Sequence, residues 1–143
     1  MSFQDDFTLQ LRADLAQALA LPAAAVYVGR QAQKVTRTGL EVWVRPRAAE
    51  QPARASGDPV KVHPFEVHVR LKTRREESQT GGNQLEEVQA TLNLLQERYD
   101  GTRPFVQALP DLVALSVEDV NLDEDPEEPD LLDGVLVLRA LER

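Results

Sequence analysis

Two stretches of the chain repeat apolar residues at intervals of three and four, the spacing that lines up side chains along one side of an α-helix. The first runs from about Ser2 to Ala20, and its apolar side consists of Phe7, Leu11, Leu15, Ala18 and Leu19. The second begins near Asn83, and its apolar side consists of Leu85, Val88, Leu92, Leu95 and Tyr99. The pattern predicts two amphipathic helices, ended by Pro22 and by Gly101.

Five further stretches have the apolar patterns of β-strands, at residues 25–28, 35–44, 65–71, 112–120 and 131–141. Alternation is strictest in 65–71, and the last stretch is apolar on both sides, which predicts a central or covered strand. The order is helix, three strands, helix, two strands. It predicts an α+β fold, a single domain over residues 1–143, with a mixed or antiparallel sheet of about 4–5 strands and both helices packed on one face.

Two connecting segments differ in composition from the rest. Residues 46–64 contain four prolines and Gly57, which predicts a long loop or arm, because proline cannot donate to a strand ladder. Residues 121–130 (NLDEDPEEPD) are acidic and contain two prolines, which predicts a solvated connection between the last two strands.

Composition removes several classes of function. With 143 residues, 42% of them hydrophobic, the chain is long enough to bury a core unaided. The absence of cysteine excludes disulfides, thiolate metal sites and cysteine nucleophiles. Asp5 and Asp6 stand where a secretory signal would be basic, and the longest apolar stretch, Ala18 to Val28, is too short to span a bilayer. We therefore expect a soluble protein with no membrane partner, made in the cytoplasm.

Charge is divided unevenly along the chain. The net charge of -8 argues against sequence-independent nucleic-acid binding. Residues 30–75 nevertheless hold eleven Lys or Arg against four acids, whereas residues 111–133 hold ten acids and no base. Opposite patches can register contacts between identical copies. The candidate contact or lumen residues are Arg70, Lys72, Arg74, Arg75, Asp123, Glu124, Asp125, Glu127 and Glu128. The alternative, that both segments are merely solvated, stays open.

Candidate catalytic and metal-binding groups are few. His63 and His68 lie five apart, hence on opposite faces of a strand, so with Glu66 they are a poor metal site and read better as exposed histidines at a strand edge. The run from Asp123 resembles the start of a calcium loop, but it has Glu128 and Gly134 where such a loop needs Gly and Glu. No nucleophile or phosphate-binding motif is present. We expect no enzyme, cofactor or metal.

Trp43 is the chain's only tryptophan and alternates with apolar neighbours in its predicted strand. It therefore lies either on the second face of the sheet or in a subunit contact, and we favour the contact.

The element order resembles that of the tail-terminator (tail-completion) proteins of long-tailed bacteriophages, over most of residues 5–142. The resemblance rests on the opening amphipathic helix, on a strand that leads into a helix (FEVHVRLKTRREESQTGGNQLEEVQATLNLLQ), and on two closing strands (LVALSVEDV and GVLVLRAL). The chain departs from that family in the length and the Pro/Arg content of residues 46–64.

The resemblance implies a structural virion protein whose ring, usually a hexamer, caps the tail tube, ends its polymerisation and joins it to the head connector. It implies the protein itself, the tail tube protein and the connector as partners, DNA only passing through the lumen, and a place in the virion tail or neck after assembly in the host cytoplasm. The 46–64 arm would then bind a partner through Arg45, Arg47, Arg54 and Lys61. The alternatives are another neck, connector or tail-tube component, a cation-dependent binding module, or a small hydrolase.

Overall fold

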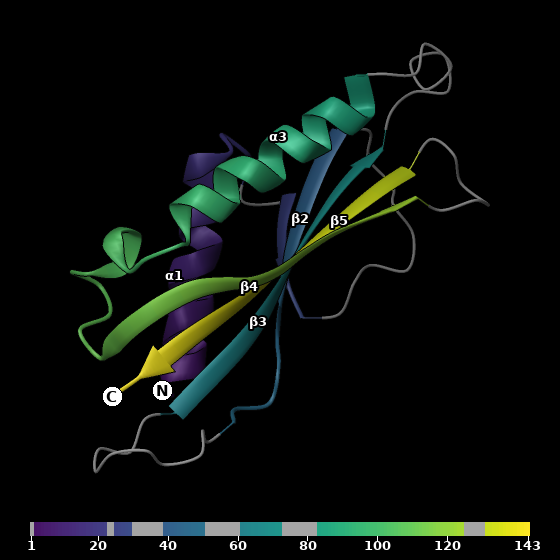
Figure 1. The fold of residues 1–143 in the computed structure, drawn as a ribbon. Helices are drawn as coiled ribbons and strands as arrows, with labels where there is room; N and C mark the ends of the chain where they lie inside the picture. Colours follow the sequence, from purple (N-terminus) through teal and green to yellow (C-terminus); the bar gives the residue numbers. More distant parts are fainter. Residues whose placement is uncertain (1, 23–24, 30–38, 51–60, 73–82, 125–130) are drawn as a thin grey trace.

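A computed structural model describes residues 2–22, 25–29, 39–50, 61–72, 83–124 and 131–143 (Figure 1). Its elements are α1 (Phe3–Ala18), β1 (Val26–Val28), β2 (Gly39–Pro46), β3 (Lys61–Lys72), α3 (Asn83–Arg98), a short 3-10 turn (Arg103–Phe105), β4 (Leu112–Glu124) and β5 (Leu131–Glu142). The strands form one five-stranded sheet in the order β1-β2-β3-β5-β4. β1 and β2 are parallel and the other pairs antiparallel. The predicted α+β fold with a mixed sheet is confirmed.

The core lies between the two helices and one face of the sheet. Alternate residues of β3, from Phe65 to Leu71, are buried there, as the period-two pattern predicts. Both helices contribute to this one cluster, with Phe7, Leu11, Leu15, Val88, Leu92 and Leu95, and Tyr99, directly after α3, belongs to it too. β5 is central, since it pairs with β3 on one side and β4 on the other. Within the described ranges, no helix combines the length and apolar character needed to cross a membrane.

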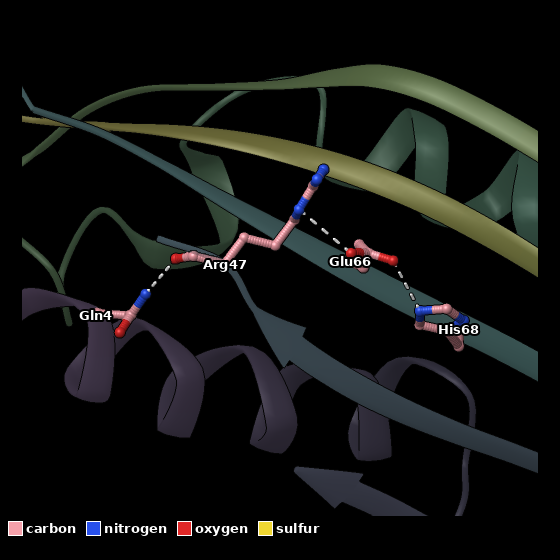
Figure 2. Close-up of polar contacts among 4 residues, drawn as sticks. All are labelled: Gln4, Arg47, Glu66 and His68. Atoms are coloured by element: carbon pink, nitrogen blue, oxygen red, sulfur yellow. Dashed lines mark hydrogen bonds and ion pairs between the residues drawn. The ribbon is translucent and has the colours of Figure 1, made fainter. Parts of the chain in front are cut away.

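β3 begins earlier than its sequence predicts, because Pro64 is accommodated inside it. The Arg47 N–H donates to the Pro64 carbonyl at 3.0 Å, but Pro64 has no N–H to return to the Arg47 carbonyl. The Gln4 side chain of α1 donates to that carbonyl instead, at 2.6 Å (Figure 2). The prediction of a loop up to Pro64 is therefore wrong for residues 61–64. Residues 51–60 of the predicted arm lie outside the described ranges.

β4 also extends beyond its predicted end. Residues 121–124, predicted as part of the acidic connection, are the last residues of the strand and pair with β5 from Val135 to Leu132. Leu122 is half-buried against the core, so the apolar alternation continues through the acidic sequence. The register shifts between Leu112 and Ala114 and again between Val117 and Asp119, as at β-bulges. Residues 125–130 lie outside the described ranges.

A polar cluster joins the two helices beside this core. Asp14 of α1 accepts two hydrogen bonds from the Arg98 guanidinium, both at 2.6 Å, and one from the Tyr99 hydroxyl at 2.8 Å. Burial and the neighbouring carboxylate raise the pKa of Tyr99 above its ordinary value, so the hydroxyl stays a donor at neutral pH. The carboxylate thus ties the end of α3 to α1.

Close packing of α3 on β5 predicts that Gly134→Ala is destabilising. An added Cβ would lie 2.8 Å from a methyl group of Leu92, which is buried. Overpacking of this kind costs about 1–3 kcal/mol, measured by urea unfolding. In a Leu92→Ala background the same change costs less, because the clashing methyl groups are gone. Equal costs in both backgrounds would contradict the assignment.

The carboxylate between the two helices gives a second prediction about stability. Asp14→Ala leaves the buried Tyr99 hydroxyl without its acceptor and lowers the free energy of unfolding by about 1–3 kcal/mol. Tyr99→Phe removes only the hydroxyl and costs less, about 1 kcal/mol. Thermal and urea unfolding of both variants test this. Two changes each below about 0.5 kcal/mol would show that the cluster contributes nothing.

Candidate functional site

The sheet face opposite the core carries the polar side chains, and no described helix lies on it. We call it the helix-free face. Its residues come from three neighbouring strands, and they are Glu41, Trp43 and Arg45 of β2, Glu66, His68 and Arg70 of β3, and Asp133, Val135 and Val137 of β5. Strand pairing places these residues in rows across the sheet, such as Glu41, Arg70 and Asp133. Several are buried, although they face away from both helices.

Trp43 lies at the centre of this face. Its ring stacks on the His68 imidazole, with 5.1 Å between centroids and 5° between planes. The Arg70 guanidinium carbon lies 4.7 Å from the centroid of the same indole, in cation–π contact. Trp43 is only 2% exposed. Of the two positions predicted for it, the second face of the sheet is confirmed and the favoured subunit contact is wrong, because neighbours in its own chain cover the ring.

Arg70 is held within the chain. Its Nε and Nη2 donate to the two Asp133 carboxylate oxygens at 3.0 and 3.1 Å, a bidentate pair. Its side chain is 7% exposed, so the expectation of an exposed arginine available to a neighbouring subunit is wrong here. On the other side, the strand register places Glu41 opposite Arg70; Glu41 is 2% exposed, and its Oε1 has no hydrogen-bond partner among the described residues. Arg70 therefore compensates the charge of the half-buried Asp133 carboxylate, and the strand register brings the buried Glu41 into the same row.

Glu66 links the helix-free face to the end of β2 (Figure 2). One carboxylate oxygen lies 3.1 Å from His68 Nε2 and the other 3.4 Å from Arg47 Nε. The prediction that Glu66 and His68 share a strand face is confirmed. The Arg47 side chain is 55% exposed, so its ion pair is screened by solvent and adds little stability.

His63 lies on the opposite face, as its parity predicts, but it is not exposed. It is 5% exposed, its ring centroid lies 4.9 Å from that of Phe3, and its Nε2 lies 2.9 Å from Glu142 Oε1. The expectation of exposed edge histidines is wrong because β3 has a strand on each side. Within the described ranges, no three His, Asp or Glu side chains are grouped to hold a metal ion.

The remaining predicted site residues are spread over the molecule. Arg45 and Lys61 are exposed, at the end of β2 and the start of β3. Lys72 ends β3, and Asp123 and Glu124 end β4, so both segments reach the same end of the sheet as the paired start of β5. The others, which lie outside the described ranges, are Arg54, Arg74, Arg75, Asp125, Glu127 and Glu128.

Sequence reasoning did not identify Glu41 and Asp133 as the residues that flank Arg70. A signal for Glu41 exists, because an acid within the apolar run from Leu40 to Val44 is unusual in a buried strand. Asp133 gives a similar signal, because it is an acid near the start of the apolar strand β5. Assigning either to Arg70 requires the strand register, which comes only from the assembled sheet.

A groove of about 730 Å³ lies between the ends of the two helices and the 3-10 turn. Its lining mixes Glu97 and Asp100 with Arg98 and Arg103, and Arg98 already pairs with Asp14. The groove therefore has no single charge preference that would define a ligand.

Comparison with known proteins shows a likeness of fold. No protein-family model matches the chain, and no curated protein is similar to it in sequence. Among solved structures, a chain from the "Virion of native gene transfer agent (GTA) particle" superposes with a TM-score of 0.61 at 21% identity. The match covers 99% of this chain and 94% of that one. The likeness establishes a shared fold over the whole length.

The burial of Arg70 predicts a large effect of removing its charge. Arg70→Met leaves the Asp133 carboxylate without its bidentate partner, in the same row as the buried Glu41, and lowers the free energy of unfolding by about 3–5 kcal/mol. It also changes the emission of Trp43, the only tryptophan, because the guanidinium lies over that ring. The matched control is Arg139→Met on β5, where the side chain is 40% exposed and the change costs less than about 1 kcal/mol. Similar losses in the two variants would contradict this account.

Proposed function

We propose that this chain is a structural virion protein that forms a ring, hexameric by analogy with the tail-terminator family. The ring caps the tail tube, ends its polymerisation and joins it to the head connector. The observation that carries the proposal is the shared fold, over 99% of this chain and 94% of the other, with a chain of a gene transfer agent virion. The family resemblance found in the sequence points to the same class of protein by a separate route.

The arrangement of polar groups supports a role in assembly. On the helix-free face, His68, Arg70, Glu66 and Asp133 contact one another or Trp43 through ion pairs and ring stacking. Exposed charges instead lie toward the sheet edges and strand ends, where Arg45, Arg47 and Lys61 contrast with Glu118 and Asp119 of β4. Charges in such positions suit the recognition of another protein surface.

The proposed ring carries a net negative charge of -8 per chain. Carboxylates that line its bore would repel the phosphates of DNA, so DNA would pass through without binding. The predicted partner-binding role of Arg45, Arg47, Arg54 and Lys61 remains part of this proposal, with the tail tube or the head connector as the partner.

The test is control of tube length. The purified protein is added to polymerising tail tube protein from the same particle, and tubes are measured by negative-stain electron microscopy. We expect shorter tubes with a ring at one end, and an effect that saturates when every growing end carries one ring. An acidic globular protein of similar charge serves as control and leaves tube length unchanged.

Two other outcomes have defined meanings. If the protein polymerises into tubes by itself, it is a tube component of the same assembly and the terminator role fails. If tube length is unaffected and no density appears at tube ends, the capping proposal fails outright.

A further inference from the structure

We infer that copies of this chain bind head to tail through opposite edges of the sheet, with the β4 edge of one copy against the Arg45–Arg47 end of β2 in the next. The inference rests on the proposed function, in which identical copies form a ring, and it names the surfaces that meet. Neither surface belongs to the buried cluster around Trp43.

Both edges are available for contact. β4 is the last strand of the sheet, so none of the described strands pairs with its outer side. At the other edge, β1 pairs only with Val42–Val44 of β2, and the Gly29 N–H makes the last bond, to the Val44 carbonyl. From Arg45 onward, that side of β2 has no strand partner among the described residues. Unpaired sheet edges are natural binding surfaces for another chain.

The two edges carry opposite charges at the same height in the sheet. Strand pairing places Arg45, Glu66, Val137 and Asp119 in one row that runs from β2 to β4. The register shift between Val117 and Asp119 adds Glu118 at that level, so two acids stand together on the β4 edge. Two residues further along, Arg47 bonds to Pro64, Pro64 pairs with Arg139, and Arg139 pairs with Ser116. Arg47 and Ser116 therefore lie at the same height on the two edges. At the level of Arg45, one base on the β2 edge therefore faces two acids on the β4 edge, whereas Arg47 is level with Ser116.

Arg45, Glu118 and Asp119 are exposed to a neighbouring copy. Arg45 is exposed and has no ion-pair partner in the described part of the chain. The Glu118 side chain is 53% exposed, and its closest cation, Arg139, is 4.0 Å away. Asp119 is exposed, and among the described residues its carboxylate accepts from the Val120 N–H and from the Asn121 side chain. Within one chain the two edges are three strand spacings apart, about 14 Å, so they cannot satisfy each other.

Strand direction also suits this contact. β2 and β5 run the same way, because each is antiparallel to β3, and β4 runs opposite to β5. When copies are placed side by side in the same orientation, β4 is therefore antiparallel to the end of β2 in the next copy, beyond Val44, where β1 no longer pairs with it. Such a heterologous contact uses a different surface on each copy and closes into a ring when the rotation between copies permits. The bulges limit continuous backbone pairing, so the charged side chains select the register.

Cysteine cross-linking tests this contact directly, since the native chain contains no cysteine. Arg47→Cys with Ser116→Cys places one thiol on each edge and leaves Arg45 and Asp119 intact. Treatment with a short bismaleimide is expected to give a denaturing-gel ladder that extends beyond the dimer, up to the size of a closed ring. Each single variant gives at most a dimer, because one thiol allows one link. The matched control, Arg47→Cys with Gln89→Cys on the exposed side of α3, also stops at the dimer.

Charge exchange then tests the register. Adding Asp119→Arg to the Arg47→Cys and Ser116→Cys pair lowers the yield of species above the dimer by about tenfold, because like charges now meet. Adding Arg45→Glu as well restores the ladder. No ladder, or a ladder indifferent to both changes, overturns the inference. A protein that caps tubes without giving the ladder fails this inference alone, whereas one that gives the ladder without capping tubes fails only the proposed function.

Discussion

The alternation of side chains along β3 governs both faces of the molecule, because this strand has a bonded neighbour on each side. Its apolar residues meet α1 and α3, so the helices have one place to pack. Its polar residues face away from the helices, between β2 and β5, where they pair with one another across the sheet. A shift of one residue in the pairing of β3 would exchange the two sets and remove both the core and the polar rows.

The order of elements, the fold class and the core were predictable because each depends on local periodicity. Phe7, Leu11 and Leu15 follow the helical period, and Phe65 to Leu71 the strand period, without reference to distant residues. The central position of β5 was one of the two positions that its apolar residues on both sides predicted.

The errors concern residues whose environment depends on distant partners. A proline is expected to end a strand because it has no N–H to donate. Pro64 nevertheless lies within β3, because the Gln4 side chain of α1 donates to the Arg47 carbonyl in its place. Arg70 looks like an exposed charge in sequence, and it becomes buried because register places Asp133 and Glu41 beside it. His63 is buried by Phe3 and Glu142, residues near the two ends of the chain. None of these contacts produces a periodic pattern in the sequence from which it could be predicted.

The hydrogen bond from Gln4 to the Arg47 carbonyl connects positions separated by 43 residues. A side chain in the first turn of α1 here replaces a backbone donor that the sheet lacks. Fraying of that turn would expose an unpaired carbonyl at the exit of β2, and fraying of that exit would release the turn. The first turn of α1 and the basic end of β2 thus open as one cooperative unit. A contact that stabilises either segment therefore lowers the local opening of both.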